Sequence, residues 1–238
     1  MHEKLRGIKA LSLDFWKTLA NDPSKENRTA RGRLIRDRLA PAMEVAEVEA
    51  LVKVVKHELD DKTQTQGTGV QYGFKPRVQG VYELMPDDKR VQELTEELLA
   101  QIDQEQAEIM KQFPPELLES DLIQTLATIK ALGLMIVVSS NTGYIDGGHM
   151  RAVIEILGLS ELIDAYVYSN EVGVAKPSPE FFAKVLEAIG LTSEEVLHIG
   201  DNYHADYLGA IAAGMHALHL SSGDDTDSEK IARLSDLI

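Results

Sequence analysis

Four segments of this chain end in polar side chains of the kinds that bind phosphate groups and metal ions. In chain order these side chains are Asp14 and Thr18, Ser140 and Asn141, Lys176, and the pair Asp201 and Asp206. Carboxylate oxygens suit a hard divalent cation such as Mg²⁺, whereas lysine, hydroxyl and amide groups suit phosphate oxygens. A carboxylate at the end of a strand can also act as a nucleophile. The residue types therefore point to a site for a cation and a phosphorylated small molecule.

The segments before these side chains have the pattern of buried β-strands. Residues 8–13 form a short apolar run that ends at Asp14, and residues 134–138 are continuously apolar. Three shorter runs lie at 165–168, 196–199 and 216–220. Helices are predicted between the strands, at about 122–132, 147–157, 179–189 and 204–213. This alternation predicts a parallel α/β sheet covered on both faces, with the polar strand ends at one edge.

Residues 20–118 differ in character, because they contain no convincing strand. Their apolar positions recur at helical spacing, for example at Val48, Val52 and Val55. Pro41 should end a helix over 26–39, and Gly67-Thr68-Gly69 should interrupt the next one. Pro86-Asp87-Asp88 predicts the start of a helix over 87–112, which Pro114-Pro115 closes. About four helices are expected in this insert.

The two patterns together predict one interrupted domain. The strand that ends at Asp14 needs a sheet to join, and the other predicted strands all lie beyond residue 118. Residues 1–19 and 119–238 are therefore expected to form the α/β core, and residues 20–118 a helical insert.

Composition narrows the classes of protein. The chain has 238 residues, no cysteine and a formal net charge of -15, with 44% hydrophobic residues. The absence of cysteine excludes disulfides and thiolate metal sites, and no apolar run approaches the ~20 residues that span a bilayer. The acidity disfavours binding to nucleic acid or an anionic membrane. We expect a soluble, cytoplasmic protein without nucleic-acid or membrane partners, and the sequence gives no indication of the oligomeric state.

The order and spacing of the polar residues resemble those of the haloacid dehalogenase superfamily. The matching pattern is Asp14-x-x-x-Thr18-Leu19, an apolar strand with Ser140-Asn141, Lys176-Pro177-x-Pro179, and Gly200-Asp201-x-x-x-x-Asp206-x-x-Gly209-Ala210-x-x-Ala213-Gly214. Each motif alone is weak, but four in order are specific and span the whole predicted core. The insert between the first two motifs resembles the cap of that family. The resemblance implies a Rossmann-like, doubly wound parallel sheet with an inserted α-helical cap domain.

The resemblance also implies a chemistry, namely a hydrolase with an aspartyl intermediate. Asp14 would attack phosphorus in a small phosphorylated metabolite and form an aspartyl-phosphate. Mg²⁺ would be held by Asp14, by the backbone carbonyl of Trp16 and by Asp201. Asp206 would either coordinate the ion through water or orient Lys176.

Phosphate binding is implied for a second set of matching residues. Ser140 and Lys176 would bind the transferring phosphoryl oxygens, with Asn141 close by. Thr18 of the first motif would also belong to the phosphate-binding residues.

Position 16 departs from the pattern of the family's phosphatases. Those enzymes usually carry a second aspartate two residues after the nucleophile, where it protonates the leaving oxygen and later activates water. This chain has Trp16, which has no carboxylate to do that work. General acid–base catalysis is worth roughly 10²–10⁴ in rate, so an alcohol leaving group would depart slowly unless another group substitutes. Candidate substitutes are His149, His204, Asp22 and Glu171.

The departure at Trp16 leaves two alternatives open. The first is a dehalogenase-like or phosphonatase-like hydrolase, which would need no such acid. In a dehalogenase the halide leaves without a proton. A phosphonatase would use a lysine of the insert, and the available lysines are Lys25, Lys53, Lys56 and Lys62. However, dehalogenases do not need magnesium, and Asp201 is not expected in them. The other alternative is a catalytically weakened binding or regulatory protein.

Substrate choice is expected to lie in the insert. Five arginines occur within eleven residues, at Arg28, Arg31, Arg33, Arg36 and Arg38. They could hold a distal anion of the substrate or pair with nearby acidic residues. The glycine-rich loop at 67–73 could fold over the site as a lid or simply connect two helices.

Overall fold

The computed structural model describes residues 3–223 and 229–238, and within them a six-stranded parallel sheet has the order β3-β2-β1-β4-β5-β6. The strands are β1 (Ala10–Leu13), β2 (Met135–Ser140), β3 (Ala165–Tyr168), β4 (Val196–Gly200), β5 (His216–Leu220) and β6 (Lys230–Ile231). The five predicted strands are confirmed. The short β6 was not predicted, because two residues carry no periodic signal. Part of the polar stretch before it, 224–228, lies outside the described residues.

Strand β1 lies in the middle of the sheet, and its register aligns the polar strand ends. All four of its residues are fully buried, as expected for a strand with helices on both faces. Leu13 pairs with Val138 of β2 and with Ile199 of β4. One step further along all three strands, Asp14 therefore lies at the same edge as the polar ends of β2 and β4.

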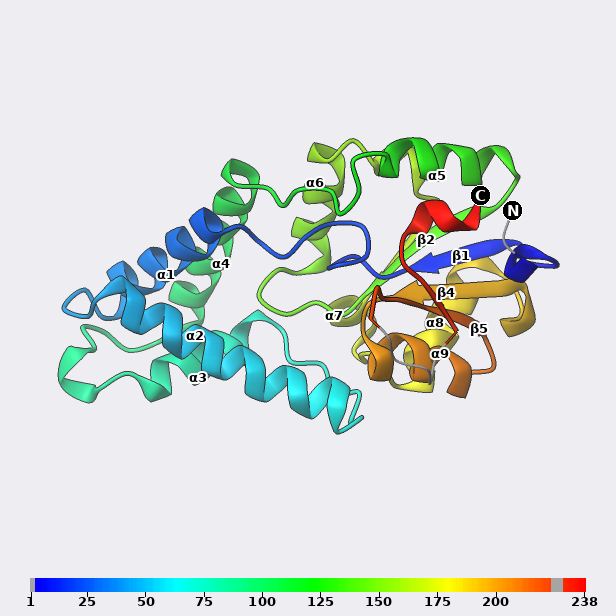
Figure 1. Cartoon of the computed structure of the whole chain (residues 1–238). Coiled ribbons are helices and arrows are strands. Elements are labelled where there is room, and N and C mark those ends of the chain that lie inside the picture. The colour runs from blue at the N-terminus through cyan, green and yellow to red at the C-terminus, as the bar shows by residue number, and fades with distance from the viewer. Residues whose placement is uncertain (1–2, 224–228) are drawn as a thin grey trace.

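Helices cover both faces of the sheet (Figure 1). On one face, α5 (Leu122–Ala131) and α6 (Gly147–Ile156) contribute to a large apolar cluster with the strands. On the other, α8 (Pro179–Ile189) and α9 (Gly209–Ala212) pack against a second cluster that includes Phe181 and Phe182. The short α7 (Ser169–Val172) follows β3 directly. None of the described helices is long and apolar enough to cross a bilayer.

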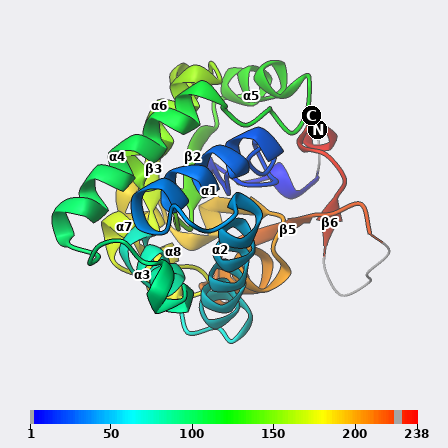
Figure 2. The same cartoon turned by 90° about the vertical axis from the view of Figure 1, so that its left-hand side faces the viewer.

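The helical insert between β1 and β2 builds a hydrophobic cluster of its own. Its helices are α1 (Lys25–Leu39), α2 (Val45–Asp60), α3 (Phe74–Leu84) and α4 (Glu96–Gln112). Figure 2 shows these four helices in front of the sheet when the molecule is viewed from the insert side. Tyr144, from the loop between β2 and α6, packs into the insert cluster and so ties the insert to the core.

Two helix predictions were wrong in their boundaries. The helix expected over 87–112 begins only at Glu96, where Thr95 caps it by accepting a hydrogen bond from the Leu98 amide. The segment at Asp87–Lys89 is a single 3₁₀ turn, and Val91 beyond it is exposed, so no apolar face extends that far. The helix expected over 204–213 begins as a π-helical segment, Tyr203–Leu208, before α9. π turns of this kind are frequent at functional sites.

Candidate active site

Lys176 lies at the centre of the predicted site. Its Nζ donates to Asp14 Oδ1 at 2.8 Å, to Asp206 Oδ1 at 2.6 Å and to the Ser139 carbonyl at 2.8 Å. The side chain is only 2% exposed, so all three of its protons are satisfied inside the protein. Three segments that lie far apart in the sequence thus meet around one ammonium group.

Asn141 positions the backbone that carries Lys176. Its side-chain amide donates to the Lys176 carbonyl at 2.9 Å, and its side-chain oxygen accepts from the Lys176 amide at 2.8 Å. This two-point contact fixes the loop before α8 against the end of β2. In the structure the Asn141 side chain holds the backbone of Lys176, and its predicted place near bound phosphate stays a prediction.

Strand β4 ends in a glycine because Asp206 passes over that point. A Cβ built on Gly200 would lie 2.3 Å from the Asp206 carboxyl group, so no larger residue fits. The Asn202 amide donates to Asp206 Oδ2 at 2.9 Å, which holds the carboxylate towards Lys176. The sequence Gly200-Asp201 therefore combines a close approach of Asp206 with a second carboxylate at the strand end.

The three carboxylates form a group with the donor chemistry of a divalent-cation site. Asp14, Asp201 and Asp206 each offer an oxygen that lies within 4.8 Å of the others. Hard carboxylate oxygens fit Mg²⁺. Both oxygens of Asp206 already accept hydrogen bonds, one from Lys176 and the other from the Asn202 amide, which favours an orienting role for Asp206. Asp14 and Asp201 are the better placed ligands.

Burial and charge set the protonation states at this edge. Burial raises the pKa of Asp14, and the attraction of Lys176 offsets only part of the increase. Burial also works against the charged form of Lys176, but the charges of Asp14 and Asp206 outweigh it, so the pKa of Lys176 is raised. Burial works against the charged form of Asp206 too, but Lys176 and His198 together hold its pKa well below the usual range. Burial, together with the charges of Asp14 and Asp206, raises the pKa of Asp201 to about 7.

The raised pKa of Asp201 predicts how pH affects the stability of the metal-free protein. The folded state keeps a proton on Asp201 up to about pH 7, whereas the reference pKa is 3.8. Between these values the folded state binds more protons than the unfolded chain, so this group's contribution to the free energy of unfolding falls as pH rises. From pH 5 to pH 8 the expected loss is roughly 2 kcal/mol.

Asp201→Asn should remove that loss. Urea unfolding in EDTA at pH 5 and pH 8 measures it, because the wild type should lose more stability than the variant between the two pH values. Added Mg²⁺ should then stabilise the wild type at pH 8 more than the variant. Equal pH dependence in both proteins would contradict the assignment.

A buried hydrogen-bond chain beneath the carboxylates was not predicted. His198 on β4 is fully buried, with Nε2 3.2 Å from Asp206 Oδ1 and Nδ1 2.9 Å from Ser12 Oγ. The ionised Asp206 can only accept, so Nε2 carries the proton and Nδ1 accepts from Ser12. Burial keeps the pKa of His198 below its ordinary value, which favours this neutral form. The sequence signal that could have indicated this hydrogen-bond chain is the histidine within an otherwise apolar strand.

Two further predicted phosphate ligands are Ser140, the last residue of β2, and Thr18, in the turn that follows Asp14. Ser140 is 1% exposed, its Oγ donates to the Asn141 carbonyl at 3.4 Å, and its nearness to Asp14 acts to lower the pKa of that carboxyl group. Thr18 is fully buried, and its Oγ1 has no hydrogen-bond partner within the described part of the chain. An unpaired buried hydroxyl is costly and fits a group that awaits a ligand. Their roles as phosphate ligands stay predictions.

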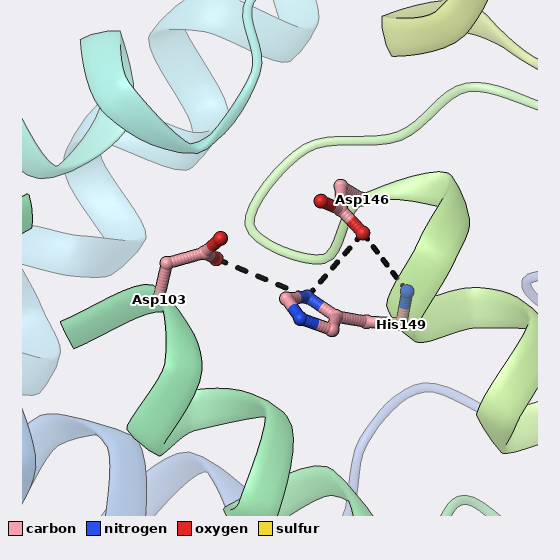
Figure 3. Close-up of side chains that lie close together, drawn as sticks. All are labelled: Asp103, Asp146 and His149. Atoms are coloured by element: carbon pink, nitrogen blue, oxygen red, sulfur yellow. Dashed lines mark hydrogen bonds and ion pairs between the residues drawn. The ribbon is translucent and has the colours of Figure 1, made fainter. Parts of the chain in front are cut away.

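Most candidate substitutes for the missing acid are engaged elsewhere. Figure 3 shows His149 of α6 between Asp146 and Asp103, with Nδ1 3.3 Å and 3.9 Å from their oxygens. That group joins α4 of the insert to α6 of the core. Glu171 pairs with Arg151, and the His204 ring lies against Tyr203. Asp22 lies 3.9 Å from the ammonium of Lys17, the residue after Trp16.

The glycine-rich loop of the insert contacts the segment that leads to Lys176. The Ala175 amide donates to the Gly69 carbonyl at 2.8 Å, and Val70 forms a β-bridge with Val174. A Cβ on Gly69 would lie 2.6 Å from the Ser178 side chain, so glycine permits this approach. The loop therefore lies beside the site.

The arginine-rich helix α1 has several of its side chains in local contacts. Arg36 pairs with its neighbour Asp37, and Arg38 pairs with Glu105 of α4. Arg28 donates to the Pro23 carbonyl. These contacts match the alternative in which the cluster pairs within the insert.

Comparison with known proteins shows which protein family this chain is similar to. A family profile described as haloacid dehalogenase-like hydrolase matches residues 8–214. The solved structure of a HAD phosphatase from Thermococcus onnurineus superposes with a TM-score of 0.65 at 18% identity, covering 97% of this chain and 96% of that one. This likeness supports the fold, including the helical region between the first two strands.

Two curated relatives match shorter stretches. The mouse haloacid dehalogenase-like hydrolase domain-containing protein 3 is 32% identical over 104 residues, which are 44% of this chain and 40% of the mouse protein. The glyceraldehyde 3-phosphate phosphatase of Methanopyrus kandleri is 34% identical over 73 residues, which are 31% of each chain. The chain thus spans less than half the length of these relatives.

Proposed function

Because the chain belongs to the haloacid dehalogenase-like hydrolase family, we propose that it is a magnesium-dependent phosphatase of a small phosphorylated metabolite, with Asp14 as the nucleophile. One observation carries this proposal. The ammonium of Lys176 lies between Asp14 and Asp206, and Asp201 lies beside them, so positive charge and carboxylates meet at one strand edge. The name of the Methanopyrus relative supports a phosphorylated substrate.

The chain's own residues divide the work of phosphoryl transfer. An oxygen of Asp14 attacks phosphorus and forms an aspartyl-phosphate, which water then hydrolyses. Ser140 binds a transferring phosphoryl oxygen, and the unpaired hydroxyl of Thr18 is a further candidate contact. Lys176 binds a second phosphoryl oxygen by exchanging its hydrogen bond to Asp14 for one to the substrate. Asp206 orients Lys176, and the neutral His198 holds Asp206 through its Nε2 proton.

The proposed metal ligands are Asp14, the backbone carbonyl of Trp16 and Asp201. The set consists of hard oxygen donors, which fit Mg²⁺. When bound there, Mg²⁺ offsets the repulsion between Asp14 and the incoming anion. The raised pKa values of Asp14 and Asp201 support this, since a cation would favour the charged form of both groups.

We also propose that residues 20–118 act as a cap over a core formed by 1–19 and 119–238. The insert packs around its own apolar cluster and meets the core at points beside the site. One such point is the hydrogen bond from Asn202 Nδ2 to Gln64 Oε1, at 2.8 Å. A segment that borders the site from outside the sheet is placed to select the substrate.

The residue at position 16 supports a second candidate, dehalogenation of a small haloacid. Trp16 packs edge-to-face on Phe15 with ring centroids 4.9 Å apart and has no acid to offer. A halide leaves without a proton, so that chemistry would not need one. Asp201 favours the phosphatase, because a metal-independent dehalogenase has no use for a third carboxylate beside the nucleophile.

The proposal predicts magnesium-dependent release of inorganic phosphate. A panel of phosphorylated sugars, acids and amino acids, assayed with Mg²⁺, should contain at least one substrate. EDTA should lower its turnover by at least about a hundredfold, because the carboxylates then repel the anion. Halide release from 2-haloacids in EDTA would favour the second candidate. Ligand-induced stabilisation without turnover of any compound would favour a binding protein.

A further inference from the structure

Lys17 has the one positive φ angle among the described residues other than glycine, at 55°. Left-handed backbone brings Cβ close to the carbonyl oxygen of an L-residue, so glycine is the usual occupant. The tight turn after Asp14 imposes this conformation, since the Lys17 amide donates to the Ala20 carbonyl at 2.6 Å. The Lys17 side chain is 56% exposed, so burial of the side chain does not compensate for the strain. Backbone strain at such a position motivates a search for a function of the side chain.

The Lys17 ammonium lies at the rim of the carboxylate group. Its Nζ is 3.7 Å from Asp201 Oδ2 and 3.9 Å from Asp22 Oδ2. Lys176, by contrast, is buried beneath the carboxylates. The site therefore has two cationic side chains, one inside and one at the solvent-exposed side.

We propose that Lys17 stabilises the negative charge that develops on the leaving oxygen during phosphoryl transfer. This inference rests on the proposed phosphatase function. In-line attack requires the leaving oxygen to lie opposite the attacking oxygen of Asp14. The alcohol product must leave to solvent, so the proposal places the leaving oxygen on the exposed side of the carboxylates, the side on which Lys17 lies. Trp16 offers no proton there, and fixed positive charge is the other general means of helping a poor leaving group to depart.

The reaction balances without a proton from the protein. An oxygen of Asp14 forms a bond to phosphorus, and the bond between phosphorus and the leaving oxygen breaks. The electron pair of that bond stays on the leaving oxygen, which takes a proton from water. Lys17 keeps its own protons and contributes charge alone. A second water then attacks the aspartyl-phosphate and releases inorganic phosphate.

The test compares leaving groups of different quality in variants of Lys17. The substrates are p-nitrophenyl phosphate, whose leaving group is a stable anion, and glycerol 1-phosphate, whose alkoxide is unstable. Lys17→Met should lower kcat/KM for glycerol 1-phosphate by about tenfold or more and for p-nitrophenyl phosphate by less than about twofold. Lys17→Arg keeps the charge and should stay within about threefold of the wild type on both substrates.

Two further variants separate this role from a structural one. Lys17→Gly should show the kinetic loss of the Met variant, yet its midpoint of thermal unfolding should rise by about 2–4 °C because the backbone strain is relieved. In Trp16→Asp, which supplies an acid beside the leaving oxygen, the loss caused by Lys17→Met should shrink.

The outcomes distinguish this inference from the proposed function. Equal losses on both substrates, equal behaviour of the Met and Arg variants, or a wild type that hydrolyses only the aryl ester would overturn the role of Lys17. If Asp14→Asn abolishes turnover but Lys17→Met leaves it unchanged, the role of Lys17 is also overturned, whereas the phosphatase proposal still stands. Absence of magnesium-dependent phosphate release from either ester and from the metabolite panel would remove both.

Discussion

Asp14→Asn is expected to abolish turnover of any substrate found for this protein, lowering kcat by at least about 10³-fold. An amide cannot form the covalent bond to phosphorus that the carboxylate forms. The substitution keeps the side-chain shape and an oxygen that can accept the 2.8 Å hydrogen bond from Lys176 Nζ. The fold should therefore survive, and the loss should appear in kcat with little change in the circular dichroism spectrum.

The stability of Asp14→Asn is a second readout. Burial and the charge of Asp206 raise the pKa of Asp14, so the folded metal-free protein disfavours this carboxylate in its charged form. Removing that charge should leave the unfolding midpoint in EDTA unchanged or higher. Asp37→Asn, on the exposed surface of α1, is the matched control and should retain full activity. Turnover that persists in Asp14→Asn after repeated purification would refute the nucleophile assignment.

Lys176→Met is expected to cause the largest loss of stability, about 3–5 kcal/mol in the free energy of unfolding. The substitution removes the ammonium that separates Asp14 from Asp206, and both carboxylates are at least nine-tenths buried. Two buried negative charges would then face each other with the Ser139 carbonyl also unpaired. Urea unfolding in EDTA at pH 8 measures the loss, and turnover should fall with it.

The matched control for Lys176→Met lies on the surface of α8. Lys184 pairs with Glu187 at 2.8 Å, with both side chains exposed, so Lys184→Met should cost less than about 0.5 kcal/mol. In the double variant Asp14→Asn/Lys176→Met, only Asp206 keeps a negative charge among the two carboxylates that contact Lys176, and part of the stability should return. A Lys176→Met protein as stable as Lys184→Met would show that Lys176 does not hold the site together.

The sequence by itself determined the sheet and predicted the main candidate site residues. Apolar runs and helix signals are local, so five strands and the helical insert could be predicted from short windows. The ordered motifs then placed Asp14 and Asp201 at strand ends, where parallel strands share an edge, and Lys176 in the loop before α8. The pairing of Leu13 with Val138 and Ile199 agrees with that placement.

Only the tertiary structure decided what these residues contact. The bond between Asn141 and the Lys176 backbone joins segments 35 residues apart, and Ser12 and His198 meet across 186. Such contacts depend on strand register and on side-chain direction, which local periodicity does not encode. The start of α4 at Glu96 likewise depends on which apolar face finds a partner in the insert. The left-handed conformation of Lys17 follows from the turn that links β1 to the insert, and a lysine carries no sequence signal for it.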